Sequence, residues 1–212
     1  HFNVSAGYAY SDLGREKLDE LYARVFGAER ALVRTQFVSG THALATVLFG
    51  ILRPGDRLVS VTGTPYDTMQ TVIGWAHESC GSLKEFGVSY DELPMRDGRV
   101  DLAGIARIVT PETKVALVQR SRGYSERQPL SIADIRAVSA RIKAANPNCI
   151  VFVDNCYGEF VETEEPTAIA DVDIMAGSLI KNPGGGLAPT GGYIAGRSDL
   201  VEMASYRLTA PG

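Results

Sequence analysis

The sequence is short of the residues that build cross-links and metal sites. It has three cysteines, Cys80, Cys149 and Cys156, and no two of them form a CxxC pair. This spacing argues against a zinc site and against a disulfide framework. We therefore expect a cytoplasmic protein that holds no metal and depends on its hydrophobic core for stability.

Long apolar runs and blocks of one charge are missing as well. No apolar run reaches the ~18 residues that a membrane span needs, and no secretory signal is visible. Lysine and arginine total 21 against 25 aspartate and glutamate, which leaves a net charge of -4 and no basic cluster. We expect neither a membrane nor a nucleic acid as a partner.

What the sequence does contain is an alternation of apolar runs and amphipathic segments. Apolar runs with the length of strands lie at 30–33, 57–61, 82–88, 114–119, 149–155, 172–178 and 191–196. Helical periodicity or buried-helix composition occurs at 14–27, 41–52, 64–74, 101–109, 131–146 and 198–208. Strands that are apolar on both faces and alternate with helices predict an α/β fold: a three-layer, mostly parallel sheet with helices on both faces.

The domain organisation follows from the length and the two ends. The 212 residues suit one domain with a core of its own. The chain starts at His1 instead of a methionine and stops soon after its last predicted helix. We therefore expect residues 1–212 to be one domain of a longer polypeptide.

Ligands of such sheets bind at the carboxyl ends of the strands, and Lys181 lies there. It follows the run VDIMAGS by three residues, precedes NPGGG, and is the only lysine after Lys143. A lysine amine in a partly desolvated pocket can form a Schiff base, and the glycines allow a ligand to approach the backbone. A solvated loop lysine is the alternative reading of this position.

Asp154 ends the apolar run CIVFVD and is the second candidate. An acid at this position can pair with a ligand cation such as a pyridinium N–H, which keeps the ring protonated and makes it an electron sink. A helix cap or a turn aspartate is the alternative.

An anion site is predicted at the start of the helix in VSGTHALAT. Gly40 admits a close approach, the first N–H groups of a helix are free to bind an anion, and Ser39 or Thr41 can add a hydroxyl. A plain helix cap is the alternative. The chain has no GxxxxGK[ST] motif, so a nucleotide P-loop is not supported.

Tyr66, after the run RLVSV, is the fourth candidate, because its ring could stack on a flat ligand. A core or surface tyrosine is the alternative. Together with the anion site, Asp154 and Lys181, it describes four points that hold pyridoxal 5'-phosphate: phosphate, ring face, ring nitrogen and aldehyde carbon.

At this point the chain resembles the fold-type-I pyridoxal-phosphate enzymes, and within them the methionine gamma-lyase and cystathionine lyase-like family often called aluminium resistance proteins. The resemblance spans nearly all residues. It is most specific in three segments, GYAYSDLGREKLDELYARVFGAERALVRTQFVSGTHAL, VFVDNCYGEF and AGSLIKNPGGGLAPTGGYIAG.

The resemblance implies a role for each candidate. Lys181 would carry the cofactor as a Schiff base and Asp154 would pair with its ring nitrogen. Tyr66 would stack on the ring, and a phenol beside a cationic ring has a lowered pKa, which would suit a proton donor. The phosphate would be held by Gly40, Thr41 and Ser178, with Ser39 as a further hydroxyl.

The family also implies an assembly. Tyr10 and Arg15 lie in a segment that reaches the phosphate of a neighbouring subunit in related lyases, so a homodimer or homotetramer is expected. Residues 1–212 would be the large, cofactor-binding domain, and the C-terminal small domain would not be covered. The expected activity is a carbon-sulfur lyase that acts on methionine, cystathionine or a cysteine-type substrate by beta- or gamma-elimination. The alternatives are transamination on the same scaffold and a non-catalytic cofactor-binding or interaction protein.

Three further features stay without an assigned role. His42 either lies near the phosphate or is a core histidine. His77 and Cys156 have no partner at catalytic spacing. The segment from Gln119 to Tyr124 ends a strand at the ligand edge and can contact cofactor or substrate.

Overall fold

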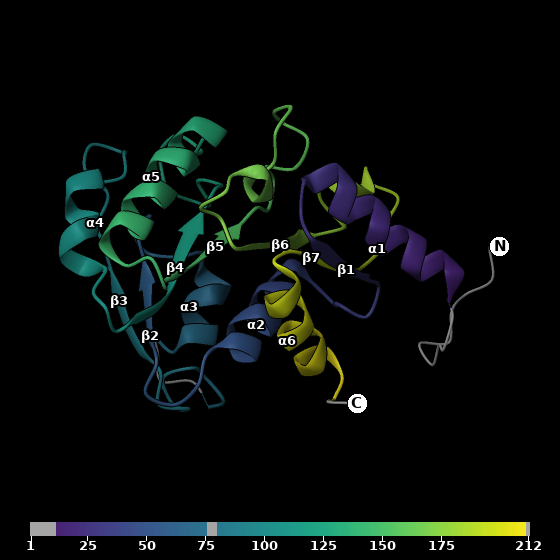
Figure 1. The fold of residues 1–212 in the computed structure, drawn as a ribbon, viewed down its shortest axis with the longest axis horizontal. Coiled ribbons are helices and arrows are strands. Elements are labelled where there is room, and N and C mark those ends of the chain that lie inside the picture. The colour runs from purple at the N-terminus through teal and green to yellow at the C-terminus, as the bar shows by residue number, and fades with distance from the viewer. Residues whose placement is uncertain (1–11, 76–79, 211–212) are drawn as a thin grey trace.

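The computed structural model describes residues 12–75 and 80–210, which fold into one sheet with helices on both sides (Figure 1). The strands are β1 (Arg30–Arg34), β2 (Arg57–Ser60), β3 (Ser89–Glu92), β4 (Thr113–Gln119), β5 (Ile150–Asp154), β6 (Ile174–Ser178) and β7 (Gly192–Gly196). The helices are α1 (Leu13–Phe26), α2 (Gly40–Ile51), α3 (Asp67–Ile73), α4 (Leu102–Ile108), α5 (Ile132–Ala145) and α6 (Ser198–Leu208). Two short 3-10 turns, η1 (Pro166–Ala168) and η2 (Asn182–Gly184), complete the described elements.

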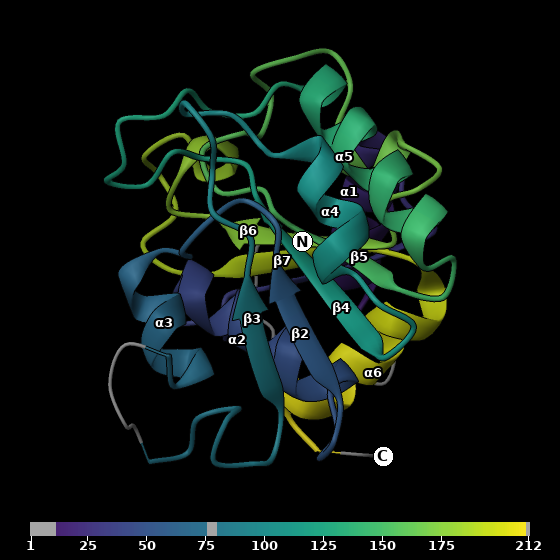
Figure 2. The same cartoon turned by 90° about the vertical axis from the view of Figure 1, so that its left-hand side faces the viewer.

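The sheet is mixed and mostly parallel, with the strand order β1-β7-β6-β5-β4-β2-β3. Strands β3, β2, β4, β5 and β6 pair in parallel, whereas β7 runs antiparallel to both β6 and β1. The parallel strands therefore end at a common edge, and Figure 2 shows β2, β3 and β4 pointing the same way. In the register of this edge Gln119 lies beside Asp154, and Asp154 lies beside Ala176.

Two hydrophobic clusters hold the three layers together. One cluster joins α1, α4 and α5 to one face of the sheet, and the other joins α2, α3 and α6 to the opposite face. Helix α2 is the best buried of the second group, as its apolar composition predicts, because α6 covers its outer side. Gly50 permits this packing, since a Cβ there would lie 3.0 Å from the Ala204 Cα.

The predicted strand at 82–88 is wrong. These residues form turns closed by backbone hydrogen bonds such as Gly87 N to Lys84 O, and the strand begins at Ser89. Gly87 has a φ of +81°, which reverses the chain before it can extend. Leu83 and Val88 are buried by these turns whereas Phe86 is exposed, so the apolar composition of the segment does not correspond to a strand.

The ends of two helices are set by the capping residues that the sequence predicts. The predicted cap of α5 is confirmed: Ser131 Oγ accepts from Asp134 N, and the Asp134 side chain accepts from Ser131 N. Helix α1 ends at Gly27 with a φ of +66°.

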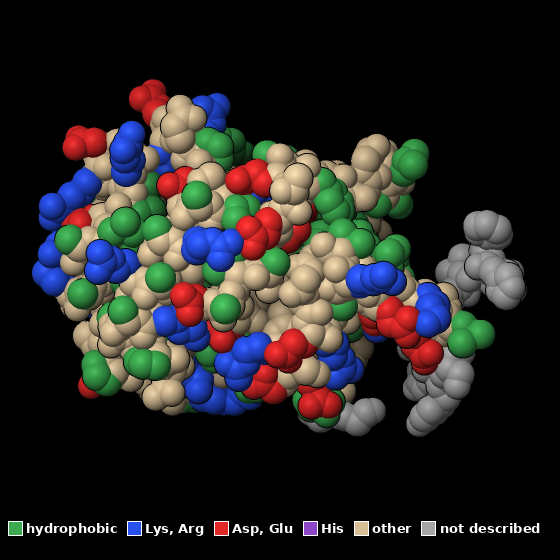
Figure 3. Space-filling model, turned by 45° about the horizontal axis from the view of Figure 1, so that its top comes forward, with side chains coloured by type: hydrophobic (Ala, Val, Ile, Leu, Met, Phe, Trp, Pro, Cys, Tyr) green, Lys and Arg blue, Asp and Glu red, His purple; other side chains and the backbone are tan. Residues whose placement is uncertain are grey.

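The helices within the described residues all lack the length or the hydrophobicity to cross a membrane. Figure 3 shows basic and acidic side chains lying side by side over much of one face.

Candidate active site

Lys181 lies just beyond the end of β6, at the common edge of the parallel strands. Its side chain is half-buried, and its Nζ stands 4.2 Å from the centroid of the Tyr157 ring and interacts with the Cys156 thiol. The next residue, Asn182, anchors the loop by donating from Nδ2 to the carbonyl oxygens of Tyr157 (3.2 Å) and Glu159 (2.9 Å). The structure therefore holds the amine against the protein at the edge where a ligand would bind.

The charge of the Lys181 amine is set by competing effects. Burial by itself would lower its pKa, but the neighbouring Cys156, Asp154 and Tyr157 outweigh burial and raise it. Since burial also raises the pKa of the Cys156 thiol well above its ordinary value, that thiol is neutral at physiological pH. The Asp154 carboxyl is then the acidic neighbour that matters for Lys181, and a nucleophilic amine requires the loss of a proton.

Asp154 is the last residue of β5 and is 6% exposed. The Cys156 backbone N–H donates to its Oδ1 at 3.1 Å. Burial raises the pKa of Asp154, and the contacts with Cys156 and Lys181 oppose that rise. Among the described residues no salt bridge reaches this carboxylate, so it can accept a cationic N–H from a ligand.

The start of α2 meets the end of β6, where the sequence predicts an anion site. A Cβ at Gly40 would lie 3.0 Å from the Ser178 Cβ and 3.2 Å from the Cys156 Sγ, so only glycine fits without a shift. Ser178 is fully buried, and its Oγ has no hydrogen-bond partner among the described residues. A buried hydroxyl without a partner beside the free N–H groups of a helix start fits a bound phosphate.

The two other hydroxyls predicted for this site have local partners. Ser39 is the N-cap of α2 and accepts from His42 N at 3.1 Å, which is the capping role that the sequence left open. The Thr41 and Thr68 hydroxyls share a hydrogen bond of 2.7 Å. Both Ser39 and Thr41 still border Gly40 and can donate to an anion there.

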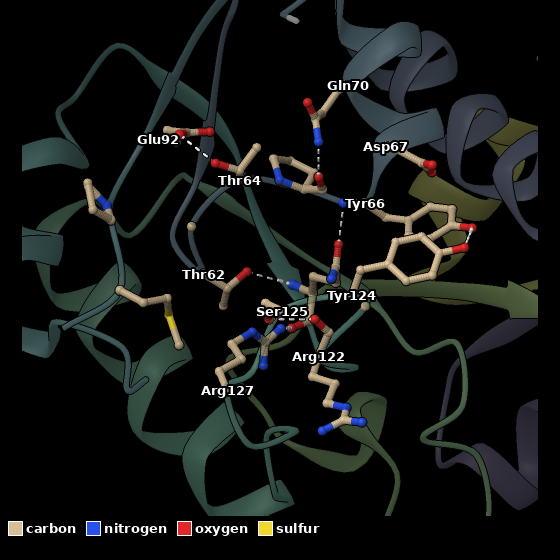
Figure 4. A pocket seen from close by; sticks show the side chains of 16 residues that line it. Thr62, Thr64, Tyr66, Asp67, Gln70, Glu92, Arg122, Tyr124, Ser125 and Arg127 are labelled. Atoms are coloured by element: carbon tan, nitrogen blue, oxygen red, sulfur yellow. Dashed lines mark hydrogen bonds between the residues drawn. The ribbon is translucent and has the colours of Figure 1, made fainter. Parts of the chain in front are cut away.

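Tyr66 lies at the N-cap position of α3 and is half-buried. Its ring stacks on Tyr124 with a centroid distance of 5.5 Å and an interplanar angle of 29°, and the two hydroxyls are 3.4 Å apart (Figure 4). The hydrogen bond with Tyr124 and partial burial raise the pKa of Tyr66 to about 12. This direction is opposite to the one expected for a phenol beside a cationic ring, and it keeps the hydroxyl protonated at neutral pH.

The segment after β4 now divides into positioning and structural residues. Gln119 is buried and accepts from Tyr66 N at 2.7 Å through its Oε1, so it fixes the start of α3 (Figure 4). Arg120 is 2% exposed and binds the Asn155 side chain and the Gly158 carbonyl, both at 2.8 Å. Arg120 therefore stabilises the loop that carries the other site residues.

A cavity of about 430 Å³ lies beside Tyr66 and Tyr124, at the ends of β2, β3 and β4 (Figure 4). Arg122 is exposed at its wall, and Thr64 donates to Glu92 Oε1 at 2.8 Å on the far side. Its lining mixes polar side chains such as Glu92 and Arg122 with a larger share of apolar surface.

The other sequence candidates have surroundings of their own. His42 lies half-buried in the first turn of α2, where its Nδ1 accepts from Val38 N at 3.2 Å and its ring packs edge-on against Phe37. Arg15 lies near Asp12 at the start of α1, which projects from the body of the domain (Figure 1). Tyr10 and His77 lie outside the described residues.

The structure adds three side chains that the sequence did not assign. Cys156 touches both the anion site and Lys181, Tyr157 underlies the Lys181 amine, and Glu159 is buried close by with an exposed fraction of 1%. An acid between glycine and phenylalanine in CYGEFV was the one available signal. The Glu159 side chain is buried because the backbone of its loop has a positive φ at Tyr157 and Phe160, and the sequence does not reveal that backbone conformation.

Comparisons with known proteins find relatives along the whole chain. Over 214 aligned residues the chain is 51% identical to the uncharacterized protein YnbB of Bacillus subtilis, and this covers 100% of the chain and 51% of YnbB. The solved structure of a carbon-sulfur lyase involved in aluminum resistance from Clostridium novyi is 50% identical with a TM-score of 0.94, and it covers 100% of this chain and 51% of that one. The chain thus spans about half the length of these relatives.

A more distant structure shows the breadth of the fold. The pyridoxal-5'-phosphate dependent protein YhfS of Escherichia coli is 18% identical with a TM-score of 0.67, over 90% of this chain and 46% of that one. At this identity the likeness concerns the fold alone. The family model for methionine gamma-lyase matches residues 1–212 in full. With this match and the relatives at about half identity, the chain belongs to the methionine gamma-lyase family.

Proposed function

We propose that this chain is the cofactor-binding domain of a pyridoxal-phosphate-dependent carbon-sulfur lyase that acts on a sulfur amino acid. The observation that carries the proposal is the grouping of an amine, a buried acid and an unpartnered hydroxyl at one sheet edge, supplied by Lys181, Asp154 and Ser178. These groups suit the aldehyde, the ring nitrogen and the phosphate of one ligand. Family membership supports the same cofactor.

Each part of the cofactor would be held by a different group of residues. Lys181 would hold the aldehyde carbon covalently, and Asp154 would accept the ring N–H. The backbone of Gly40 and Thr41 and the Ser178 hydroxyl would hold the phosphate, with Ser39 beside them. When bound, the cofactor supplies the electron sink that makes an alpha proton acidic.

The same side chains would move the protons. Lys181 Nζ would be the base that takes the substrate alpha proton. Tyr66 would be the donor to a leaving thiolate, since its hydroxyl is protonated at neutral pH, but its pKa, raised to about 12, makes it a weaker acid than the one expected for a phenol beside a cationic ring. Gln119 holds Tyr66 in place through the 2.7 Å bond to its backbone.

The whole protein is proposed to be larger than this chain. Because the chain spans about half the length of its relatives, a small domain would follow residues 1–212. A homodimer or homotetramer would bring Tyr10 and Arg15 to the site of a neighbouring subunit. An amino acid with sulfur at the beta or gamma position is the proposed substrate class.

One assay on the full-length protein tests the function. We expect release of a keto acid and a thiol from methionine, cystathionine or cysteine, and borohydride reduction should add the cofactor mass to the peptide that holds Lys181. Exchange of amino groups with keto acids without thiol release would support transamination. A protein that shows no visible absorption band and no added mass would be a non-catalytic relative.

Tyr66→Phe tests the proposed proton donor separately. The ring and its stacking on Tyr124 are kept, and only the hydroxyl is lost. We expect thiol release to slow by about 100-fold, because general acid catalysis is worth that much or more. Cofactor affinity should change little. Tyr124→Phe is the control, and thiol release by Tyr66→Phe at the parental rate would leave Tyr66 a stacking role alone.

A further inference from the structure

The backbone of Tyr157 has a conformation that tyrosine rarely adopts. Its φ is +67°, in the left-handed region that a Cβ disfavours. The residue is 61% exposed, so packing of its ring into the core does not impose this conformation. Strain of this kind persists where surrounding contacts impose it, and it gathers at functional sites. The contacts of the Tyr157 backbone and ring account for it here.

Two other segments hold the backbone around Tyr157. Arg120 donates to the Gly158 carbonyl oxygen at 2.8 Å, and the Gly158 N–H donates to the Asn155 carbonyl oxygen at 2.8 Å. A Cβ at Gly158 would collide with the Arg120 side chain, so the close passage of the two depends on glycine. Asn182 donates from Nδ2 to the carbonyl oxygen of Tyr157 itself at 3.2 Å. The turn is thus fixed by Arg120 from the buried side and by Asn182 from the neighbouring loop.

The strained turn brings the Tyr157 ring to the Lys181 amine. Lys181 Nζ stands over the ring, 4.2 Å from its centroid, which is well within the ~6 Å reach of a cation–π contact. Asn182 follows Lys181 in the sequence and binds the Tyr157 carbonyl, so it joins the two backbones. The backbone link and the ring contact therefore connect the same pair of residues.

The other titratable groups that face the amine come from the end of β5 and the loop after it. They are Asp154, Cys156 and Glu159. No carboxylate forms a salt bridge with Lys181 among the described residues. The face of the Tyr157 ring is therefore a short-range partner that distinguishes an ammonium from a neutral amine.

We propose that Tyr157 is a positioning residue for Lys181, whose ring holds the charged amine at the strand edge and binds the neutral amine less. The attraction joins the positive charge of the ammonium to the negative face of the ring, so it weakens when the amine is without its proton. The resting amine is then kept beside the site, and the neutral, nucleophilic amine is free to leave the ring. The inference rests on the proposed function for the use of the amine, and the ring contact is testable without the cofactor.

The experiment measures the protonation of Lys181 in the full-length protein after removal of the cofactor. The rate of reductive methylation at Lys181 is followed against pH by peptide mass spectrometry, with the exposed Lys114 as internal reference. Tyr157→Leu is compared with Tyr157→Phe, because both lack the hydroxyl and only the second keeps the aromatic face. We expect the apparent pKa of Lys181 to be lower in Tyr157→Leu by about half a unit, so that methylation at neutral pH is about three-fold faster.

Phe160→Leu is the matched control. Phe160 is an aromatic residue of the same loop, with a φ of +62° and an exposed fraction of 54%, but its ring lies against Phe26 with 5.6 Å between the centroids. The Lys181 profile should stay unchanged in this variant.

Identical Lys181 profiles for folded Tyr157→Leu and Tyr157→Phe would overturn the proposal. If Tyr157→Leu does not fold, Tyr157→Trp takes its place, since the exposed ring leaves room for indole and indole attracts cations more strongly than phenyl. The apparent pKa of Lys181 should then be higher in Tyr157→Trp than in Tyr157→Phe, and equal values would again overturn the proposal.

The outcomes separate this inference from the proposed function. A Lys181 profile that differs between Tyr157→Leu and Tyr157→Phe, in a protein whose Lys181 takes no cofactor under borohydride, would reject the function and keep the ring contact. Normal cofactor attachment with identical profiles would keep the function and reject the role of Tyr157.

Discussion

Two aspartates of neighbouring strands are equally buried and entirely different in their surroundings. Asp154 ends β5 and Asp173 precedes β6, and each is 6% exposed. Asp173 accepts from Lys143 Nζ at 2.7 Å, Arg197 at 3.0 Å and Val151 N at 2.7 Å. Asp154 has no cation at salt-bridge distance among the described residues and is bonded by Cys156 alone.

The partners of the two aspartates distinguish a structural carboxylate from one that could bind a ligand. Asp154 lies at the carboxyl end of β5 and Asp173 lies before the start of β6, so they are at opposite ends of the parallel strands. A buried carboxylate with full partners contributes to the fold, since the removal of its charge leaves cations unpaired. A buried carboxylate without a cation costs stability, and such a cost persists where a ligand later supplies the partner. Asp173 is a structural acid and Asp154 is the acid of the candidate site.

Lys181→Ala is the strongest test of the edge that holds Asp154. With no amine to bond, the variant should retain a folded protein that binds pyridoxal phosphate only noncovalently, and elimination activity should be lost almost entirely. The visible band and the borohydride-stable mass on the parent peptide are the measurements, with Lys114→Ala as the control. An unchanged band would remove Lys181 from the site.

Asp173→Asn should have the next largest effect, and that effect should be on stability. The change leaves Lys143 without its carboxylate and removes one of the two carboxylates of Arg197, which keeps Asp199 at 2.7 Å, and charge-assisted bonds of this kind give an expected loss on the order of 3 kcal/mol. Arg197 is partly exposed and contributes the smaller share. Denaturant unfolding measures the loss, and Asp171→Asn is the neighbouring control. Full stability in Asp173→Asn would contradict the contrast between the two acids.

Asp154→Asn should behave in the opposite way. Without the carboxylate the ring nitrogen loses its partner, and exchange of the substrate alpha proton should slow by about 10- to 100-fold, the value of one hydrogen bond to a charged group. Deuterium exchange at the alpha carbon measures it. Exchange at the parental rate would remove the ring-nitrogen role.

The same variant carries a pH-dependent prediction for the cofactor-free protein. Burial raises the pKa of Asp154 above 3.8, so the folded wild type binds more protons than the unfolded chain and loses stability as the pH rises above that value. Asp154→Asn should therefore be at least as stable as wild type at pH 7, and the difference should vanish below about pH 4. Chemical unfolding at the two pH values tests the sign.

Ser178→Ala should have the smallest effect, with a sign that depends on the ligand. The Ser178 hydroxyl is buried without a partner, so its removal should leave the cofactor-free protein as stable or more stable by about 1 kcal/mol. Cofactor affinity should fall by about 10-fold, because one hydrogen bond to the phosphate is lost. Ser205→Ala, on the exposed side of α6, is the control. Unchanged affinity would place the phosphate elsewhere.

Most of the fold could be predicted from the sequence because its signals are local. Apolar runs flanked by helical periodicity predicted six of the strands and the helices that cover them, and Ser131 with Asp134 predicted a cap. The segment 82–88 failed because a run of apolar residues does not distinguish a buried turn from a strand. The reversal of β7 was not predicted either, since direction is decided by which strands pair.

The candidate site was likewise predicted in part from the sequence. Sequence order placed Lys181, Asp154 and Gly40 at strand ends and a helix start, because parallel strands must end at one edge. It did not find Glu159 or assign Cys156, and it left Arg120 without a role, since the direction of each side chain depends on loops with positive φ and on partners from distant strands.

The sequence by itself determined the layers and the chemical groups available at the carboxyl ends of the strands, because hydrophobic periodicity is a property of short segments. Only the tertiary structure decided which buried polar groups are paired and which are left open. Asp154 and Asp173 look alike in sequence as acids beside apolar strands. Their difference arises from Lys143 and Arg197, which reach Asp173 across the sheet from helix α5 and from the end of β7.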